Sequence, residues 1–228
     1  MAFRKILFSA VLTISTLSIT AEIVAEESDT KFLGVLIYDG VLTSDVTAPL
    51  EVLGSATQNI KSLAAYKVVT IGPSSAAITT QEGLHVIPDF TIDDAPMLSA
   101  LVVGSAYDMK PVLDNESLIE FVATQGQQVR WLASNCSGAY ILAKAGLLKN
   151  RKATTYPGGE LLLKTRHPFT KVVSDTYYVV DENLVTSNGG LVSYAAALQL
   201  LELMSDKAAV DKIAATLYYD RLLGTDDR

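Results

Sequence analysis

The chain has 228 residues, a formal net charge of −7 and 49% hydrophobic residues. This length suits one large α/β domain with enough apolar side chains to bury a core. The acidic balance, without a cluster of Lys and Arg, argues against nucleic acid or anionic lipid as a partner. A single cysteine excludes an intramolecular disulfide, and the two histidines lack the spacing of a metal site.

The first residues have the layout of a targeting segment. Two basic residues, Arg4 and Lys5, precede an uncharged apolar run that ends at residue 21, and small residues occur at Ala21 and Ala25. This order predicts a secretory signal peptide over residues 1–25, with cleavage between Ala21 and Ala25. The alternative is an uncleaved membrane anchor, for which the run is short. We therefore expect an exported protein, periplasmic or secreted, with no stable membrane insertion after cleavage.

From residue 30 to 224, apolar β-branched runs alternate with helical patterns, which predicts a single domain. Strands are predicted at residues 32–38, 66–72, 100–103, 129–134, 152–155, 177–180 and 184–187. Helices are predicted at 47–57, 115–124, 137–145, 191–204 and 207–217, with a hairpin at 78–88. Near-continuous hydrophobicity in the strands is typical of a sheet buried on both faces. We expect a doubly wound α/β fold, a mostly parallel sheet sandwiched by helices, with its functional crevice beyond the carboxyl ends of the strands.

The only cysteine lies in the turn Asn135-Cys136-Ser137-Gly138, between a predicted strand and a predicted helix. Such a turn lifts a thiol out of the sheet, and the free N–H groups of the following helix favour the reactive thiolate. The spacing Ser134-x-Cys136-x-Gly138 also matches a nucleophile elbow, in which small residues relieve crowding. The alternative is a buried cysteine that acts as a small hydrophobe. The local sequence leaves both interpretations open.

Three further segments carry a family resemblance. They are residues 38–53, the run Lys-Ala-Thr-Thr-Tyr-Pro at 152–157, and Thr-Ser-Asn-Gly-Gly at 186–190. Together with the cysteine turn, these segments resemble the DJ-1/PfpI superfamily, and within it the isonitrile hydratases and the amidase-like domains of certain transcription activators. The resemblance runs from about residue 32 to residue 204. It implies a flavodoxin-like sandwich that forms a homodimer and handles a small-molecule ligand or substrate without a cofactor.

The resemblance also implies an acid partner for the cysteine. In isonitrile hydratases an aspartate works with the elbow cysteine, and the matching position here is Asp45. Carried over, Cys136 attacks an electrophilic carbon while Asp45 moves the proton, which is reasonable because an acid in an apolar crevice can have a raised pKa. The alternative is that Asp45 caps the helix predicted from residue 47. Glu51, in the same helix, is expected to be solvated.

Backbone donors near the cysteine are the next expectation. Acyl-type chemistry needs preorganised N–H groups that steady developing charge, and the N–H of Ser137 is one such donor. The family takes its second donor from a Pro-Gly-Gly loop, and this chain has Val103-Gly104-Ser105 there. We therefore expect Gly104 and Ser105 to supply backbone donors from an incomplete glycine pair. The alternative is that Gly104 only ends a strand.

A second departure from the family is Tyr156, where many members have a histidine. A phenol titrates near pH ~10, so Tyr156 is no general base at neutral pH, although it can donate a hydrogen bond to a substrate or a thiolate. This argues against a Cys-His hydrolase or a glyoxalase of the usual design. The two histidines of the chain, His85 and His167, are expected at the surface.

Two functions stay open on the sequence. The first is a cofactor-free, cysteine-dependent hydro-lyase that hydrates an isonitrile-like carbon to an N-substituted formamide. The second is a non-catalytic module that binds a ligand or senses oxidants through Cys136, which the altered loop and the missing histidine favour. DNA binding is not expected, because the chain ends soon after the last predicted helix, without the helix-turn-helix region of the activator relatives.

Overall fold

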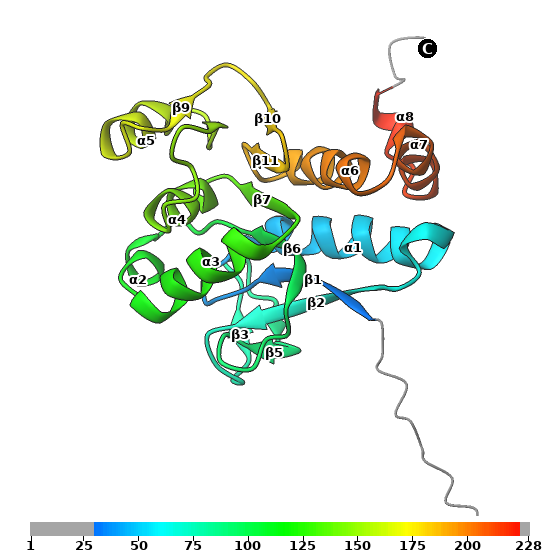
Figure 1. Ribbon diagram of the computed structural model, residues 1–228, viewed down its shortest axis with the longest axis horizontal. Coiled ribbons are helices and arrows are strands. Elements are labelled where there is room, and N and C mark those ends of the chain that lie inside the picture. Colours follow the sequence, from blue (N-terminus) through cyan, green and yellow to red (C-terminus); the bar gives the residue numbers. More distant parts are fainter. Residues whose placement is uncertain (1–29, 224–228) are drawn as a thin grey trace, which may run out of the picture.

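The computed structural model describes residues 30–223, so the predicted signal peptide lies outside the described residues. A seven-stranded sheet with the order β10-β11-β7-β6-β1-β2-β5 runs through the molecule (Figure 1). Its strands are β1 Lys31–Leu36, β2 Tyr66–Gly72, β5 Phe90–Thr91, β6 Leu98–Val103, β7 Trp131–Asn135, β10 Tyr178–Asp181 and β11 Leu184–Ser187. Neighbouring strands pair in parallel, except β10 and β11, which are antiparallel. The predicted doubly wound, mostly parallel fold is confirmed.

Helices cover the sheet in two groups (Figure 1). They are α1 Thr43–Asn59, α2 Lys110–Leu113, α3 Glu116–Gln128, α4 Gly138–Lys144, α5 Glu160–Arg166, α6 Val192–Met204, α7 Lys207–Thr216 and α8 Asp220–Leu223, with a 3-10 turn at Lys61–Leu63. Helices α1 and α6 pack against each other and against the sheet, while α3 and α4 form a second packed pair. Within residues 30–223, no helix has the length and apolar character needed to cross a membrane.

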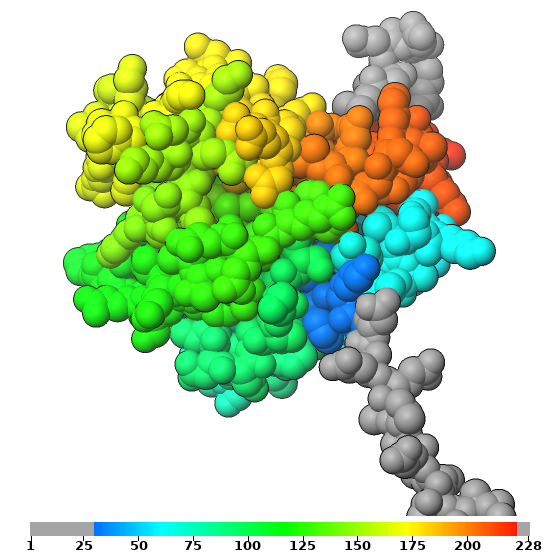
Figure 2. All heavy atoms as spheres, viewed as in Figure 1, coloured from blue at the N-terminus to red at the C-terminus, as the bar shows by residue number. Residues whose placement is uncertain are grey.

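Short strands lie outside the main sheet. The predicted hairpin at 78–88 is present as β3 Ile78–Thr79 and β4 His85–Val86, which pair antiparallel. Strand β8, Lys152–Ala153, pairs in parallel with β9, Lys171–Val172, next to the short helix α5. The space-filling view shows this region at the upper left, with α6 and α7 on the right of the molecule (Figure 2). A two-residue strand such as β9 forms by pairing with a distant segment. It is too short to leave a periodic signal in the sequence.

The core is packed on both faces of the sheet. Consecutive residues of β6, from Leu101 to Val103, are all buried, as are Val35 and Leu36 in β1. Since successive side chains of a strand point to opposite faces, burial of neighbours requires cover on both sides. This explains the continuous apolar runs in the sequence.

The strand order determines where the site forms. From β1 the chain passes to β2 on one side, whereas β6, β7 and β11 follow in turn on the other side of β1. The loops that follow β11, β7, β6 and β1 therefore leave the sheet side by side, at the point where the order of the strands reverses. In open α/β sheets this is the usual position of a ligand crevice.

The central position of Leu101 gives a direct test of the core. Leu101 is 0% exposed, whereas Leu161 in α5 is 75% exposed. We expect Leu101→Ala to lower the free energy of unfolding by about 2–5 kcal/mol, because it removes buried methyl groups and leaves a cavity. The matched surface variant Leu161→Ala should change it by less than about 0.5 kcal/mol. Urea unfolding followed by circular dichroism measures both values, and equal losses would contradict the described core.

Candidate functional site

Cys136 lies directly after β7, in the predicted strand-to-helix turn. Its backbone φ of 50° is in the left-handed region, which is uncommon for a residue other than glycine. The N–H of Cys136 donates to the Ser187 carbonyl at 2.8 Å, and its carbonyl accepts from Thr155 Oγ1 at 2.8 Å. These two bonds hold the strained turn from both sides. The residue as a whole is half-buried.

Gly138 allows the turn to approach the neighbouring strand. A Cβ atom at this position would lie 2.5 Å from the carbonyl oxygen of Val103 and 2.6 Å from that of Gly104. Both distances are shorter than a Cβ–oxygen contact allows, so only glycine fits without a shift of the backbone. The close approach brings the cysteine turn next to the loop that follows β6.

Asp45 is the buried charge of the site, with an exposed fraction of 0%. Its Oδ2 accepts from the backbone N–H of Ser105 at 3.1 Å and from the Ser105 hydroxyl at 2.5 Å. Its Oδ1 accepts from the N–H of Gly190 at 3.1 Å and from the Ser193 hydroxyl at 2.6 Å. Four donors thus surround one carboxylate. They join α1 to the loop after β6 and to the start of α6.

The interpretation of Asp45 as a helix cap is wrong. Helix α1 begins at Thr43, four residues before the predicted start, and the residue in the capping position is Leu42. Asp45 therefore lies inside the first turn, and its side chain binds distant segments instead of its own helix. In the structure the helix continues through Pro49.

Asp45 and Cys136 face a common point at Gly189. A Cβ atom on Gly189 would lie 2.4 Å from the Cβ of Cys136 and 3.2 Å from Oδ1 of Asp45. The backbone φ of 77° at this position also favours glycine. The predicted pair of acid and thiol is therefore adjacent, and both groups lie next to Gly189.

Burial dominates the ionisation of both groups. It raises the pKa of Asp45 above its ordinary value, although the hydrogen bonds from Ser105, Ser193 and Gly190 lower it. Burial likewise raises the pKa of the Cys136 thiol; the Ser105 hydrogen bond lowers it, the charge of Asp45 raises it further, and Ser137 lowers it. The sequence led us to expect that donors after the turn favour the thiolate. They do act in that direction, but desolvation outweighs them, and the resting thiol keeps its proton.

The predicted backbone donors have different surroundings. The N–H of Ser137 lowers the pKa of the Cys136 thiol. The N–H of Ser105, expected to face a substrate, donates instead to Asp45. The Gly104 carbonyl accepts from the Tyr38 hydroxyl at 2.8 Å, and burial together with the nearby charge of Asp45 raises the pKa of Tyr38 well above its ordinary value. Ser105 is therefore a donor to the carboxylate in this structure.

Two residues of the site have no signal in the sequence pattern. Ser193 is 148 positions from Asp45, and Tyr38 is 66 positions from Gly104. Both residues read as ordinary members of a helix and a strand end. Ser193 reaches the Asp45 carboxylate, and Tyr38 reaches the Gly104 carbonyl, only because the four strands end side by side.

Two other residues considered in the sequence make contacts of their own. The Tyr156 ring lies against Gly159, where a Cβ atom would be 2.5 Å from Tyr156 Cζ, and its centroid is 6.2 Å from that of Tyr140. A hydrogen bond from Tyr156 to a thiolate stays a prediction. Glu51 is exposed, as expected, and its Oε2 accepts from the Tyr194 hydroxyl at 2.7 Å.

The histidines do not form a metal centre. His85 is exposed in the hairpin, with Nδ1 3.0 Å from Thr79 Oγ1. His167 is half-buried, and burial and the charge of Arg166 lower its pKa. Within the described part of the chain, no group of three or more His, Cys, Asp or Glu side chains is placed to hold a metal ion.

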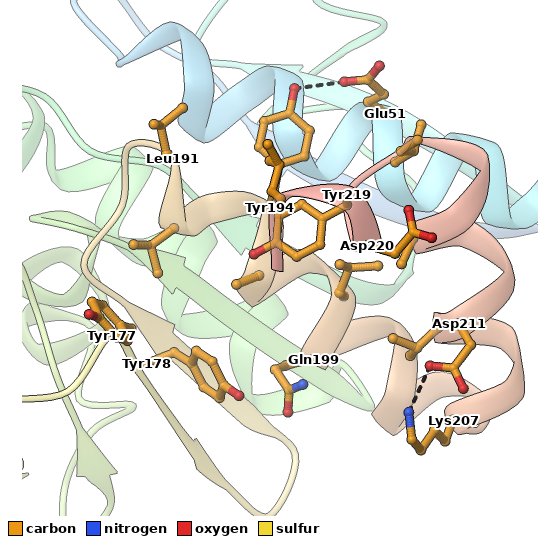
Figure 3. Close-up of a pocket in the computed structure, with 17 residues that line it drawn as sticks. Glu51, Tyr177, Tyr178, Leu191, Tyr194, Gln199, Lys207, Asp211, Tyr219 and Asp220 are labelled. Carbon is orange, nitrogen blue, oxygen red and sulfur yellow. Dashed lines mark hydrogen bonds and ion pairs between the residues drawn. The ribbon is translucent and has the colours of Figure 1, made fainter. Parts of the chain in front are cut away.

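A wide groove lies between β10, α6 and α7 (Figure 3). Its volume is about 1160 Å³, and its lining is mainly apolar and aromatic. The labelled tyrosines in its wall are Tyr177, Tyr178, Tyr194 and Tyr219, and Leu191 lies at one end (Figure 3). Cys136 and Asp45 are not among the residues that line it. The groove and the cysteine site are thus separate features.

Known proteins resemble most of this chain. An isonitrile hydratase from Pseudomonas putida is 30% identical over 170 residues, which are 75% of this chain and 70% of that protein. The HTH-type transcriptional regulator GbdR from Pseudomonas aeruginosa is 24% identical over 196 residues, or 86% of this chain. The chain spans about half of that regulator, 52% of its length.

Solved structures share the same fold. A THiJ/PfpI family protein from Pseudomonas syringae superimposes with a TM-score of 0.73 at 24% identity, over 84% of this chain and 76% of that one. DJ-1beta from Drosophila melanogaster gives a TM-score of 0.69 at 21% identity, over 83% of this chain and 98% of that one. The sequence profile of the DJ-1/PfpI family matches residues 32–203, which include the cysteine turn, Asp45 and the Gly-Gly loop. The chain therefore belongs to the DJ-1/PfpI family.

Proposed function

We propose that this protein is a cofactor-free, cysteine-dependent hydro-lyase that hydrates a small electrophile of the isonitrile type. The observation that carries the proposal is the buried, fully hydrogen-bonded Asp45 beside the thiol of the half-buried Cys136. The 30% identity to an isonitrile hydratase supports the same chemistry. Both observations support a thiol that adds to carbon and a carboxyl group that accepts and returns the proton.

The proposed reaction needs only these two groups and water. The Cys136 sulfur bonds to the terminal carbon of the isonitrile, and the thiol proton, passed through Asp45, goes to the same carbon. This gives a thioimidate joined to the enzyme. Water then adds to that carbon and gives one of its protons to the nitrogen. The carbon–sulfur bond breaks as the new hydroxyl group loses its proton to the departing sulfur, which releases an N-substituted formamide and restores the thiol.

The ionisation state of the site suits this sequence. Burial raises the pKa of the Asp45 carboxyl, which brings it nearer to the range where a group both takes and returns a proton. The N–H of Ser137 favours the charged form of the sulfur, on which negative charge develops when the carbon–sulfur bond breaks. The four hydrogen bonds to Asp45 fix the orientation of its oxygens before the substrate arrives.

The alternative, a non-catalytic ligand-binding or redox-sensing module, makes a different prediction. Oxidation of cysteine begins with the thiolate, and burial raises the pKa of the Cys136 thiol. The structure thus favours a thiol that keeps its proton until the reaction begins over one that is already ionised in the resting protein. A module of this kind would bind small molecules without turnover, which the activity measurement below distinguishes.

Activity is tested by following formamide production from small alkyl and aryl isonitriles with carbon-13 NMR. We expect Cys136→Ser and Asp45→Asn each to lower the rate by at least about 100-fold, because one removes the nucleophile and the other the proton carrier. Asp93→Asn, at an exposed position, is the matched control and should keep the wild-type rate. Turnover that survives in Cys136→Ser, or a folded wild type without turnover, would contradict the proposal.

The pH dependence of stability tests the Asp45 carboxyl. Its pKa is raised in the folded state, so the folded protein binds this proton more tightly than the unfolded chain. Between the ordinary value of 3.8 and the folded value, stability therefore falls as pH rises, by ~1.4 kcal/mol for each pKa unit between the two states. Asp45→Asn does not titrate. The wild type should lose stability relative to this variant in urea unfolding as the pH rises from the ordinary pKa towards the folded one, and a constant difference would refute the raised pKa.

We also propose that the protein is exported and forms a homodimer. Export is supported by the basic, apolar and small-residue layout of residues 1–25, and dimerisation by the family resemblance. Cell fractionation should find the full chain outside the cytoplasm, shortened by about 21–25 residues in mass spectrometry. A chain with Arg4 and Lys5 intact in the cytoplasm would contradict export.

A further inference from the structure

Residues 149–171 carry a charge opposite to that of the rest of the chain. They contain six basic residues and one acidic residue, Glu160, which gives a formal net charge of +5. Because the whole chain carries −7, the remainder of the sequence carries −12. The basic residues are Lys149, Arg151, Lys152, Lys164, Arg166 and Lys171. We expected no anionic partner from the net charge of the chain, and that average does not describe this segment.

The fold gathers the segment into one small unit. Strands β8 and β9 pair with each other, and α5, which lies between them in the chain, packs against β9. Figure 1 shows α5 and β9 at the upper left edge of the molecule. Leu163 of α5 is 0% exposed, and Arg151 Nε donates to Asp181 Oδ2 of β10 at 2.6 Å. The unit is therefore anchored to the rest of the domain, and its outer side faces solvent.

Most of its cations have no acidic partner. Within the part of the chain that the structure describes, only Arg151 of the six basic residues forms an ion pair, and the other five are exposed. Lys152 and Lys171 are register partners in the parallel β8–β9 pair. Their side chains therefore leave the same face of two strands about 4.8 Å apart. Like charges at this spacing repel each other, and a bound anion relieves the repulsion.

Large apolar side chains are exposed among these cations. Leu161 is 75% exposed, Phe169 is 68% exposed and Leu162 is 40% exposed. Residues three or four apart on a helix are surface neighbours, so Leu161 lies beside Lys164. The Nζ of Lys149 is 5.8 Å from the centroid of the Phe169 ring. Single exposed apolar residues are common, but leucines and a phenylalanine mixed with unpaired cations are typical of a helix that lies in a membrane interface.

We propose that the exposed side chains of residues 149–171, here called the α5 surface, bind the surface of a bilayer that contains anionic phospholipids. Leu161, Leu162 and Phe169 enter the boundary between headgroups and acyl chains. The lysines and Arg166 stay at the level of the lipid phosphates, with their apolar stems along the bilayer. This is binding at the surface without a membrane span, in agreement with the expectation of no stable insertion.

The apolar residues favour a membrane over another polyanion. A nucleic acid is bound mainly through charge, and the exposed leucines would gain little from it. A bilayer removes the same leucines from water while its headgroups meet the cations. The cysteine site contributes no residue to the α5 surface. The proposal therefore goes beyond the proposed hydratase function and does not rest on it.

The first measurement uses tryptophan as a local reporter. Phe169→Trp places it on the α5 surface, and Tyr107→Trp, at a position that is 76% exposed elsewhere, is the matched control. Vesicles of phosphatidylcholine with about one third phosphatidylglycerol should shift the emission of Phe169→Trp to the blue, and brominated acyl chains should quench it. Tyr107→Trp should show neither change, and vesicles of phosphatidylcholine alone should affect neither variant. The native Trp131, 4% exposed, gives the same background in both.

The second measurement separates charge from apolar contact in the Phe169→Trp chain. Titration with the mixed vesicles should show binding at least about tenfold weaker for Lys164→Gln/Arg166→Gln, since each basic residue near an anionic surface contributes about fivefold. Lys152→Gln/Lys171→Gln is a second pair with the same expected loss. The exposed lysines of Lys61→Gln/Lys67→Gln lie outside the α5 surface, and this control should bind as before.

Apolar contact is tested in the same way. Leu161→Ser should weaken binding by at least about fivefold, because a leucine no longer leaves water. Met97→Ser, at a position that is 78% exposed, is its control and should have no effect. Circular dichroism establishes that each variant is folded.

Three results would overturn the proposal. The first is a Phe169→Trp signal that the mixed vesicles leave unchanged, and the second is an equal change in Tyr107→Trp. The third is binding that the glutamine pairs abolish and Leu161→Ser leaves intact, because the α5 surface would then recognise negative charge alone, as a nucleic acid site does. The reporter is local, so an apolar leader that binds vesicles does not produce its signal.

Discussion

The burial of the Asp45 carboxylate is the constraint on which the site depends. A carboxylate removed from water is costly unless donors replace its hydration, and here two backbone N–H groups and two hydroxyls do so. These donors come from the loop after β6 and from the start of α6, whereas the carboxylate belongs to α1. The arrangement exists only because β1, β6, β7 and β11 end side by side. The order of the strands in the sheet thus determines which groups surround the Asp45 carboxylate.

The balance of burial against hydrogen bonding gives the site its chemical character. Donors around Asp45 and Cys136 favour the charged forms, but desolvation is the larger effect and raises both pKa values. A thiol that rests protonated is protected from unwanted reactions, while a neighbouring carboxylate is ready to accept its proton. Reactivity therefore comes from the pair of thiol and carboxyl group, not from a permanently ionised cysteine.

Local sequence patterns predicted the parts of the fold that depend on local physics. Continuous apolar runs marked the strands, and the small residues around Cys136 marked the strand-to-helix turn, where Gly138 allows close contact with the Gly104 carbonyl. Asp45 came only from the family resemblance, since a lone aspartate near a helix start reads as a cap. The start of α1 was predicted four residues too late, since the helix begins at Thr43.

What the sequence did not reveal depends on contacts across long separations. Ser193 meets Asp45 from 148 residues away, and Ser105 from 60 residues away, so neither contact leaves a periodic or spaced signal. Burial, which sets the direction of both pKa changes, is likewise a property of the assembled layers. We expected the donors to favour the thiolate, whereas in the structure the thiol keeps its proton. The difference arises because the burial of Cys136 was not known from the sequence.

The central claim is that Asp45 and Cys136 share one proton, and the most direct measurement is a carbon-13 NMR titration of the Asp45 carboxyl. The account predicts a main transition above the ordinary pKa of 3.8, and a second, smaller change at the pH where the Cys136 thiol ionises. Alkylation of Cys136 should remove the second change. A single transition at or below the ordinary value, unaffected by alkylation, would contradict the account.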